Sequence, residues 1–302
     1  MLYKTNIFGI VGSEKNPDYK QNHVLIYDDL NNNILYLITM NEKVLNLKLK
    51  RDRIFIVCFK KIYILDPKNG YQPTGILQTE PNPNGLLAIN YNEENTIMVY
   101  PSAEEDKEKG EITIKYLDSD VVKYLFPHKN KIAYITLSYN GLLLATASEE
   151  GRKIRIYETE NLEKLQELNR GQEIAKIKYI SIDFRNQFLA ASSERGTIHI
   201  WSLSQSLEKL KKSGKYKVNE GNNENKISNA GSIFAILPTF LGGGFFDNEW
   251  SFAQVRLDEP YSIFHFGLDN NLIIITSSGK YYKAKIDLKK GGNCTIMEEW
   301  AL

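Results

Sequence analysis

Short runs of alternating or continuous apolar residues recur along all 302 residues and are separated by turns rich in Asn, Gly and charged side chains. Such runs predict β-strands, because successive side chains of a strand point to opposite faces. They group into six units of about four strands, each about 40 to 45 residues long, which is a repeat length typical of propeller blades. We expect strands at 7–11, 23–27 and 34–39; 44–49, 53–58, 61–65 and 75–77; 86–90, 96–100, 111–116 and 121–125; 132–137, 142–147, 153–157 and 165–168; from 175 through 201 in the fifth unit; and 262–266, 272–276, 281–286 and 294–299.

This regular spacing favours an all-β propeller of four-stranded blades over a β-sandwich, whose strands need not repeat. Helical periodicity is nearly absent over long stretches. We therefore expect residues 1–302 to form one propeller domain, with a long insertion at 204–248 in the fifth unit.

The charge and cysteine content narrow the class of function. The formal net charge is +1, so no bulk attraction to nucleic acid or to a membrane is expected and any anion site must be local. Two cysteines, Cys58 and Cys294, give no disulfide framework, which fits a reducing compartment such as the cytoplasm. The N-terminus has no signal-peptide pattern, and no apolar run reaches the roughly 18 to 20 residues of a transmembrane helix.

An enzyme is not expected. The chain has four histidines, at positions 23, 128, 199 and 265, and they take part in no Ser-His-Asp order and no metal-spaced cluster. The Gly242-Gly243-Gly244 run lacks the strand-to-helix context of a nucleotide site. We expect no cofactor and no metal.

A hairpin near the middle of the chain concentrates groups that suit a phosphate. Two strands, 188–192 and 197–201, are joined by a tight Glu194-Arg195-Gly196 turn. Alternation places Thr197 and His199 on one face and two isoleucines on the other. Neighbouring hydroxyls and cations add donors, which phosphate oxygens require; they come from Ser192, Ser193, Arg195 and, after the preceding strand, Arg170. The alternative is that these Ser, Thr and His side chains stabilise the blade through internal hydrogen bonds.

The same residues resemble the PROPPIN family of phosphoinositide-binding β-propellers. Its signature is Phe/Leu-Arg-Arg-Gly followed by a Ser-Ser-x-Lys-Gly-Thr-x-His hairpin. In Leu168-Asn169-Arg170-Gly171, all but Asn169 match, and Asn169 stands where the first arginine belongs. Segments 22–29, 49–54 and 250–254 also look like family segments. The family has seven blades, and one precedes the segment that matches Met1. We expect that first blade to be missing from this sequence, the alternative being a ring closed by six blades.

The resemblance implies two headgroup pockets for phosphatidylinositol 3-phosphate or phosphatidylinositol 3,5-bisphosphate. The second pocket retains its residues, which are Arg170, Ser192, Ser193, Arg195, Thr197 and His199. The first pocket would use His128, Thr146, Ser148, Arg152 and Lys153. It has lost the arginine at Asn169 and carries Glu150 where the family usually has Lys, although Arg152 or Lys153 could compensate. We expect one strong and one weak site, with binding that strengthens at mildly acidic pH as His199 becomes protonated.

The insertion is the other candidate for membrane contact. Residues 206–230 are rich in lysine, and the run 233–241 is apolar. A buried strand or a linker would also explain such a run. The resemblance implies a membrane-inserting loop, in which exposed apolar side chains beside lysines suit the bilayer interface. The inserting residues would be Phe234, Leu237, Phe240, Leu241, Phe245 and Phe246.

Together these features predict a cytoplasmic protein that attaches peripherally to autophagic, endosomal or vacuolar membranes. As the resemblance implies, it would act as an effector or scaffold and recruit autophagy or lipid-transfer proteins, without binding nucleic acid. The alternative is a protein-interaction propeller whose lipid site is vestigial.

Overall fold

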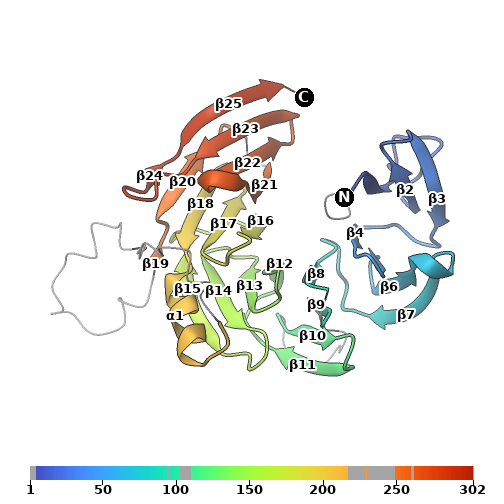
Figure 1. Ribbon diagram of the computed structural model, residues 1–302, viewed down its shortest axis with the longest axis horizontal. Helices are drawn as coiled ribbons and strands as arrows, with labels where there is room; N and C mark the ends of the chain where they lie inside the picture. Colours follow the sequence, from blue (N-terminus) through green and yellow to red (C-terminus); the bar gives the residue numbers. More distant parts are fainter. Residues whose placement is uncertain are drawn as a thin grey trace.

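Six β-sheets stand around a common centre, as the apolar repeats predict (Figure 1). The computed structural model describes residues 5–93, 95–102, 110–216, 229, 249–259 and 262–301. Sheet 1 consists of β1 (Ile7–Val11), β2 (His23–Asp28) and β3 (Asn33–Thr39). Sheet 2 consists of β4 (Asn46–Leu49), β5 (Ile54–Val57), β6 (Lys61–Asp66) and β7 (Gln72–Gln78). Sheet 3 consists of β8 (Ala88–Ile89), β9 (Ile97–Pro101), β10 (Ile112–Tyr116) and β11 (Val121–Leu125).

The remaining three sheets form the other part of the ring. Sheet 4 contains β12 (Ile132–Leu137), β13 (Leu143–Ser148), β14 (Lys153–Glu158), β15 (Lys164–Asn169) and β19 (Glu249–Trp250). Sheet 5 contains β16 (Ile177–Ile182), β17 (Phe188–Ser193), β18 (Thr197–Ser202), β20 (Ala253–Arg256) and β24 (Gly292–Asn293). Sheet 6 contains β21 (Ser262–Phe266), β22 (Asn271–Thr276), β23 (Lys280–Lys285) and β25 (Thr295–Ala301). The prediction of an all-β propeller with six visible blades is confirmed.

Within each sheet, neighbouring strands run antiparallel, except that the two-residue strands β19 and β24 join sheets 4 and 5 in parallel. Among the described residues, the short 3-10 helices Pro67–Asn69 and Leu268–Asn270 lie in turns. Helix α1 (Ser204–Lys212) was not predicted, because its nine residues are too few to show a periodic pattern within a lysine-rich segment. It lies at the start of the predicted insertion.

The core fills the spaces between consecutive sheets. Between sheets 4 and 5, apolar side chains such as Leu143 and Ile156 pack with Leu189 and Trp201, and all four are buried. Between sheets 5 and 6, Ile198 and its neighbours face the other way and pack against sheet 6. The two faces of sheet 5 pack against different neighbours. Successive residues along a strand of sheet 5 therefore point alternately toward sheet 4 and toward sheet 6.

Candidate functional site

Both candidate pockets lie where the connection between two consecutive sheets meets a hairpin turn. For the first pocket, this connection joins β11 to β12, and the Lys131 carbonyl accepts a hydrogen bond from the Glu149 amide in the β13–β14 turn. For the second pocket, it joins β15 to β16. The Ala175 amide donates to the Glu150 carbonyl, and the Glu194 amide donates to the Lys176 carbonyl. The second connection is therefore held between two neighbouring hairpin turns.

A glycine makes the close approach of these segments possible. Gly151, in the β13–β14 turn, has φ of +60°. A Cβ atom there would lie 1.9 Å from the Ala175 carbonyl oxygen, so only glycine fits at this position. Gly151 also supplies a carbonyl that accepts a hydrogen bond from Arg170.

Arg170, directly after β15, is held by backbone carbonyls on both sides of its guanidinium group. Its Nε donates to Gly151 O at 2.8 Å, and Nη2 donates to Glu173 O. The residue is only 6% exposed, and burial followed by the charge of Arg195 lowers the pKa of the guanidinium. Arginine remains charged despite such a shift. The fixed fork keeps further N–H donors for an anion.

Arg195, in the β17–β18 turn, contributes a second cation that is half exposed. Its guanidinium forms an ion pair with the Glu173 carboxylate, which is also exposed. Exposed pairs of this kind contribute little net stability, so an anionic ligand could replace the carboxylate at small cost.

His199 lies on the face of β18 that is turned toward sheet 4. Its Nδ1 is 3.1 Å from the Ser251 hydroxyl, and its ring centroid is 5.6 Å from that of Trp201. Burial, and then the charges of Arg170 and Arg256, lower the pKa of His199 to about 4. The imidazole is therefore neutral between pH 5.5 and 7.5 in the free protein. Stronger binding in mild acid would require a bound anion to raise this pKa.

The hydroxyl groups divide between two faces. Ser193 and Thr197 share the face of His199, since β17 and β18 are in register with Ala191 opposite His199. Ser192 has the opposite parity, and its hydroxyl donates to Ser262 O of sheet 6 at 3.4 Å. The structure therefore brings Ser193, but not Ser192, together with the other members of the second pocket.

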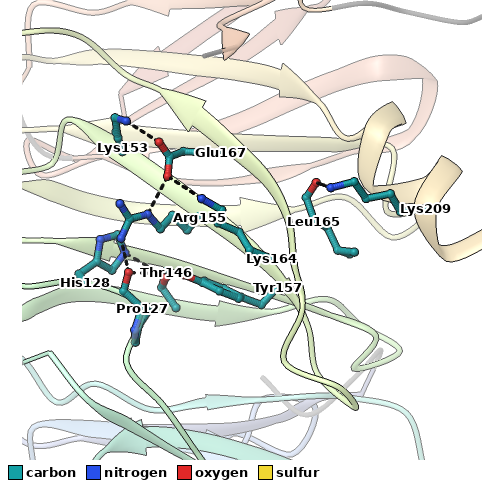
Figure 2. A network of polar contacts seen from close by, with 10 residues as sticks. All are labelled: Pro127, His128, Thr146, Lys153, Arg155, Tyr157, Lys164, Leu165, Glu167 and Lys209. Atoms are coloured by element: carbon teal, nitrogen blue, oxygen red, sulfur yellow. Dashed lines mark hydrogen bonds and ion pairs between the residues drawn. The ribbon is translucent and has the colours of Figure 1, made fainter. Parts of the chain in front are cut away.

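The first pocket has a different polar network (Figure 2). Its histidine, His128, precedes β12 and is buried, with Nε2 3.0 Å from the Thr146 hydroxyl. Burial, followed by the charge of Arg155, lowers the pKa of His128 to about 4. The ring is a neutral hydrogen-bonding group at physiological pH.

A carboxylate stands at the centre of the first pocket's cations. Arg155 Nε donates to Glu167 Oε2 at 2.8 Å, Lys153 donates to Oε1, and Lys164 Nζ is 3.4 Å from Oε2 (Figure 2). Burial acts to raise the pKa of Glu167, but the hydrogen bonds from Lys153 and Arg155, with their charges, lower it to about 2. Glu167 is therefore ionised, and Lys153 is already engaged by an internal anion.

The other predicted members of the first pocket lie at its edge. Ser148 is buried at the end of β13, and Arg152 is exposed in the following turn, where its carbonyl accepts from the Arg170 amide. The Glu150 carboxylate, in the same turn, accepts a hydrogen bond from Asn130 at 2.6 Å and adds negative charge there. Asn169 is buried opposite Lys153 in the register of β14 and β15.

Similarity to known proteins decides the family. A family model described as PROPPIN matches residues 10–302. The chain belongs to the PROPPIN family. Autophagy-related protein 18e of Arabidopsis thaliana is 30% identical over 300 residues, which cover 99% of this chain and 74% of that protein. Among solved structures, Kluyveromyces lactis Hsv2 has a TM-score of 0.73 at 18% identity, and the match covers 100% of this chain and 85% of Hsv2.

A further solved structure with this PROPPIN's fold is a complex of KlAtg21 with the coiled coil of AgAtg16. Its TM-score is 0.73 at 18% identity, covering 100% of this chain and 84% of that one. At such identities the two structures show that the fold is shared. In the second of them, a propeller of this fold assembles with a coiled coil.

Three charged residues of this PROPPIN were missed by sequence reasoning. Arg155 and Glu167 lie directly opposite Thr146 and each other across β13, β14 and β15. Arg256, on β20, lies opposite Thr197 of β18 and is exposed. The alternation of side chains along the strands could have revealed them, because each lies on the same face of its sheet as a predicted pocket residue on a neighbouring strand.

The predicted membrane-inserting residues, Phe234, Leu237, Phe240, Leu241, Phe245 and Phe246, lie outside the described residues. The helix that begins this segment packs on sheet 4. Leu207 and Leu210 are buried, and Lys209 Nζ donates to Leu165 O at 2.6 Å (Figure 2). Lys215 pairs with Glu158 and Glu160. Lys215 is therefore partly neutralised by the propeller itself, and Lys209 is held against it by a backbone carbonyl.

Two kinds of feature do not occur in the described ranges. They contain no group of three or more His, Cys, Asp and Glu side chains placed to hold a metal ion. No helix in the same ranges is long and apolar enough to cross a bilayer.

Proposed function

We propose that this PROPPIN binds the phosphorylated inositol headgroup of phosphatidylinositol 3-phosphate or phosphatidylinositol 3,5-bisphosphate at the second pocket. The observation that carries the proposal is the gathering of three cations, Arg170, Arg195 and Arg256, around neutral hydrogen-bonding groups at one blade boundary. Charge-assisted hydrogen bonds contribute about 1.5 to 3 kcal/mol each. Two or three of them suffice for selective recognition of a phosphate over a hydroxyl.

The pocket residues have different roles, set by their side-chain chemistry. Arg170 is the fixed clamp, since its guanidinium is already oriented by two carbonyls. Arg195 and Arg256 supply exposed charge at the entrance. His199 acts as a neutral donor or acceptor, and Ser193 and Thr197 orient the ligand through their hydroxyls.

Headgroup binding and loop insertion together would give reversible peripheral attachment to autophagic, endosomal or vacuolar membranes. A single weak anchor gives marginal membrane affinity, and two signals give stable attachment. In this role the protein is a non-catalytic effector or scaffold that brings autophagy or lipid-transfer proteins to the membrane. Its binding partners would dock on other surfaces of the propeller.

Liposome co-sedimentation tests this proposal. Vesicles containing either phosphoinositide should recover the protein selectively over vesicles with unphosphorylated phosphatidylinositol. Replacing Phe240 and Leu241 by Asp should lower recovery without changing the affinity for a soluble headgroup. Unchanged recovery would remove the loop from the mechanism.

A protein-interaction scaffold with a vestigial lipid site is the second candidate. Two observations favour it: Glu167 engages the cations of the first pocket, and a propeller of the same fold occurs in a complex with a coiled coil. Absence of selective lipid binding by the folded protein would support this candidate and overturn the first.

A further inference from the structure

The centre of the ring contains a cavity of about 410 Å³. It is lined by residues on or beside the innermost strands of successive sheets, among them β4, β8, β12 and β16, which surround the centre in Figure 1. The volume falls within the roughly 300 to 1,000 Å³ that is typical of small-molecule sites. The cavity is separate from both headgroup pockets, whose residues do not line it.

One cation faces this cavity. Lys48 on β4 is the only Lys, Arg, Asp or Glu among its lining residues in the described part of the chain. Within the same part, the ammonium has no hydrogen bond or ion pair, and burial lowers the pKa of Lys48. A partly buried charge without a partner is costly, and an anion would compensate it. The other titratable side chain of note, His265, is 3.3 Å from the Ser181 hydroxyl, and burial lowers its pKa, so it adds no positive charge near neutrality.

Aromatic rings supply the walls. Tyr134 and Tyr179 have ring centroids 5.5 Å apart. In the turns that follow the inner strands, Tyr139 lies 6.4 Å from Tyr91 and 4.8 Å from Phe184 between centroids. The Phe184 side chain is 70% exposed, so its ring is accessible at the edge of the cavity. Such rings favour a flat, apolar body.

We propose that the central cavity binds a small organic carboxylate with a flat aromatic body, and that Lys48 holds the carboxylate. The polar lining suits such a ligand, because Thr136 and Ser181 offer hydroxyls next to the aromatic walls. This site would let the propeller sense or carry a small molecule independently of the membrane headgroup.

Isothermal titration calorimetry with biphenyl-4-carboxylate and its neutral analogue biphenyl-4-carboxamide tests this. The wild type should bind the carboxylate at least about tenfold more tightly than the amide, as one charge-assisted hydrogen bond implies. Lys48→Met should abolish that preference. Lys60→Met, which removes an exposed lysine in the turn between β5 and β6, is the matched control and should keep it.

The unliganded variant gives a second readout. Lys48→Met removes an uncompensated charge, so its thermal midpoint should equal or exceed that of the wild type. If Lys48→Met does not fold, Lys48→Gln provides the same comparison. Failure of the wild type to bind the carboxylate, equal binding of carboxylate and amide, or a preference that survives loss of Lys48 would each overturn the proposal.

Discussion

The two pockets are built on equivalent rows of residues in adjacent blades, yet their charges differ. Across sheet 4 the row is Thr146, Arg155 and Glu167, and across sheet 5 it is Ala191, His199 and Gln254. In sheet 4 the carboxylate of the third residue binds the cations around it. In sheet 5 the third residue is neutral. The hydrogen bonds that Arg170 donates go to the backbone carbonyls of Gly151 and Glu173.

The difference shows that counting cations near a pocket is a poor guide to its ligand. The first pocket has Lys153, Arg155 and Lys164, but all three already pair with the carboxylate of Glu167. In the second pocket, no carboxylate among the described residues is within ion-pair distance of Arg170. The charges of Glu173 and Glu194 act on it only from further away, and Glu173 pairs with the exposed Arg195 instead. We therefore expect the second pocket to be the working site and the first to be closed by its own anion.

The largest effect is expected from Arg170→Ala. It removes the fixed clamp and should weaken phosphoinositide binding by about ten- to a hundredfold, given about 1.5 to 3 kcal/mol for a charge-assisted hydrogen bond. Soluble-headgroup calorimetry measures this loss. Arg51→Ala is the matched control, because it removes an exposed arginine that pairs with Glu93 far from both pockets. Equal affinities for Arg170→Ala and the wild type would overturn the assignment of the clamp.

Glu167→Gln tests the closure of the first pocket. It should release Lys153 and Arg155, allow a second headgroup to bind weakly, and lower the free energy of unfolding by about 1 to 3 kcal/mol through loss of charged hydrogen bonds. Glu163→Gln, an exposed change between β14 and β15, is the control and should alter neither property. If Glu167→Gln gains no second site, the closure by Glu167 is not what disables the first pocket.

Acid should destabilise the fold through both pocket histidines. The pKa values of His128 and His199 are lowered to about 4, so the folded state favours the neutral rings. Their contribution is complete above the unfolded pKa of about 6.5 and is lost as the pH falls toward 4, at up to about 1.4 kcal/mol per pH unit for each ring. Urea unfolding at pH 7 and pH 5 measures this. Over pH 5.5 to 7.5, His199 should contribute no pH dependence to the headgroup affinity. The affinity should fall somewhat in acid, because the phosphate monoester gains a proton near its second pKa of about 6. Stronger binding in acid would mean that the ligand protonates His199.

The smallest expected effect separates two adjacent hydroxyls. Ser193→Ala should weaken headgroup binding by about two- to tenfold, the range of a neutral hydrogen bond. Ser192→Ala should leave the affinity unchanged, because Ser192 faces sheet 6. A loss at Ser192 alone would mean that the headgroup enters from the other blade boundary.

The strands were predictable because the alternation of apolar residues reflects burial between blades, and it placed strands in all six sheets close to their observed limits. The same alternation, applied further, would have separated Ser192 from Ser193 and revealed Arg155. The motif resemblance drew attention to turn residues such as Arg152 instead. The orientation of Arg170 was not predictable, because the carbonyls of Gly151 and Glu173 that fix it meet only in the folded chain.

The most direct test of the account is the number of headgroups bound by the wild type. Calorimetric titration with a soluble short-chain phosphatidylinositol 3-phosphate should give one headgroup per chain, and Arg170→Ala should remove that site. Two headgroups of equal affinity per chain would contradict the conclusion that Glu167 closes one pocket while Arg170 keeps the other available.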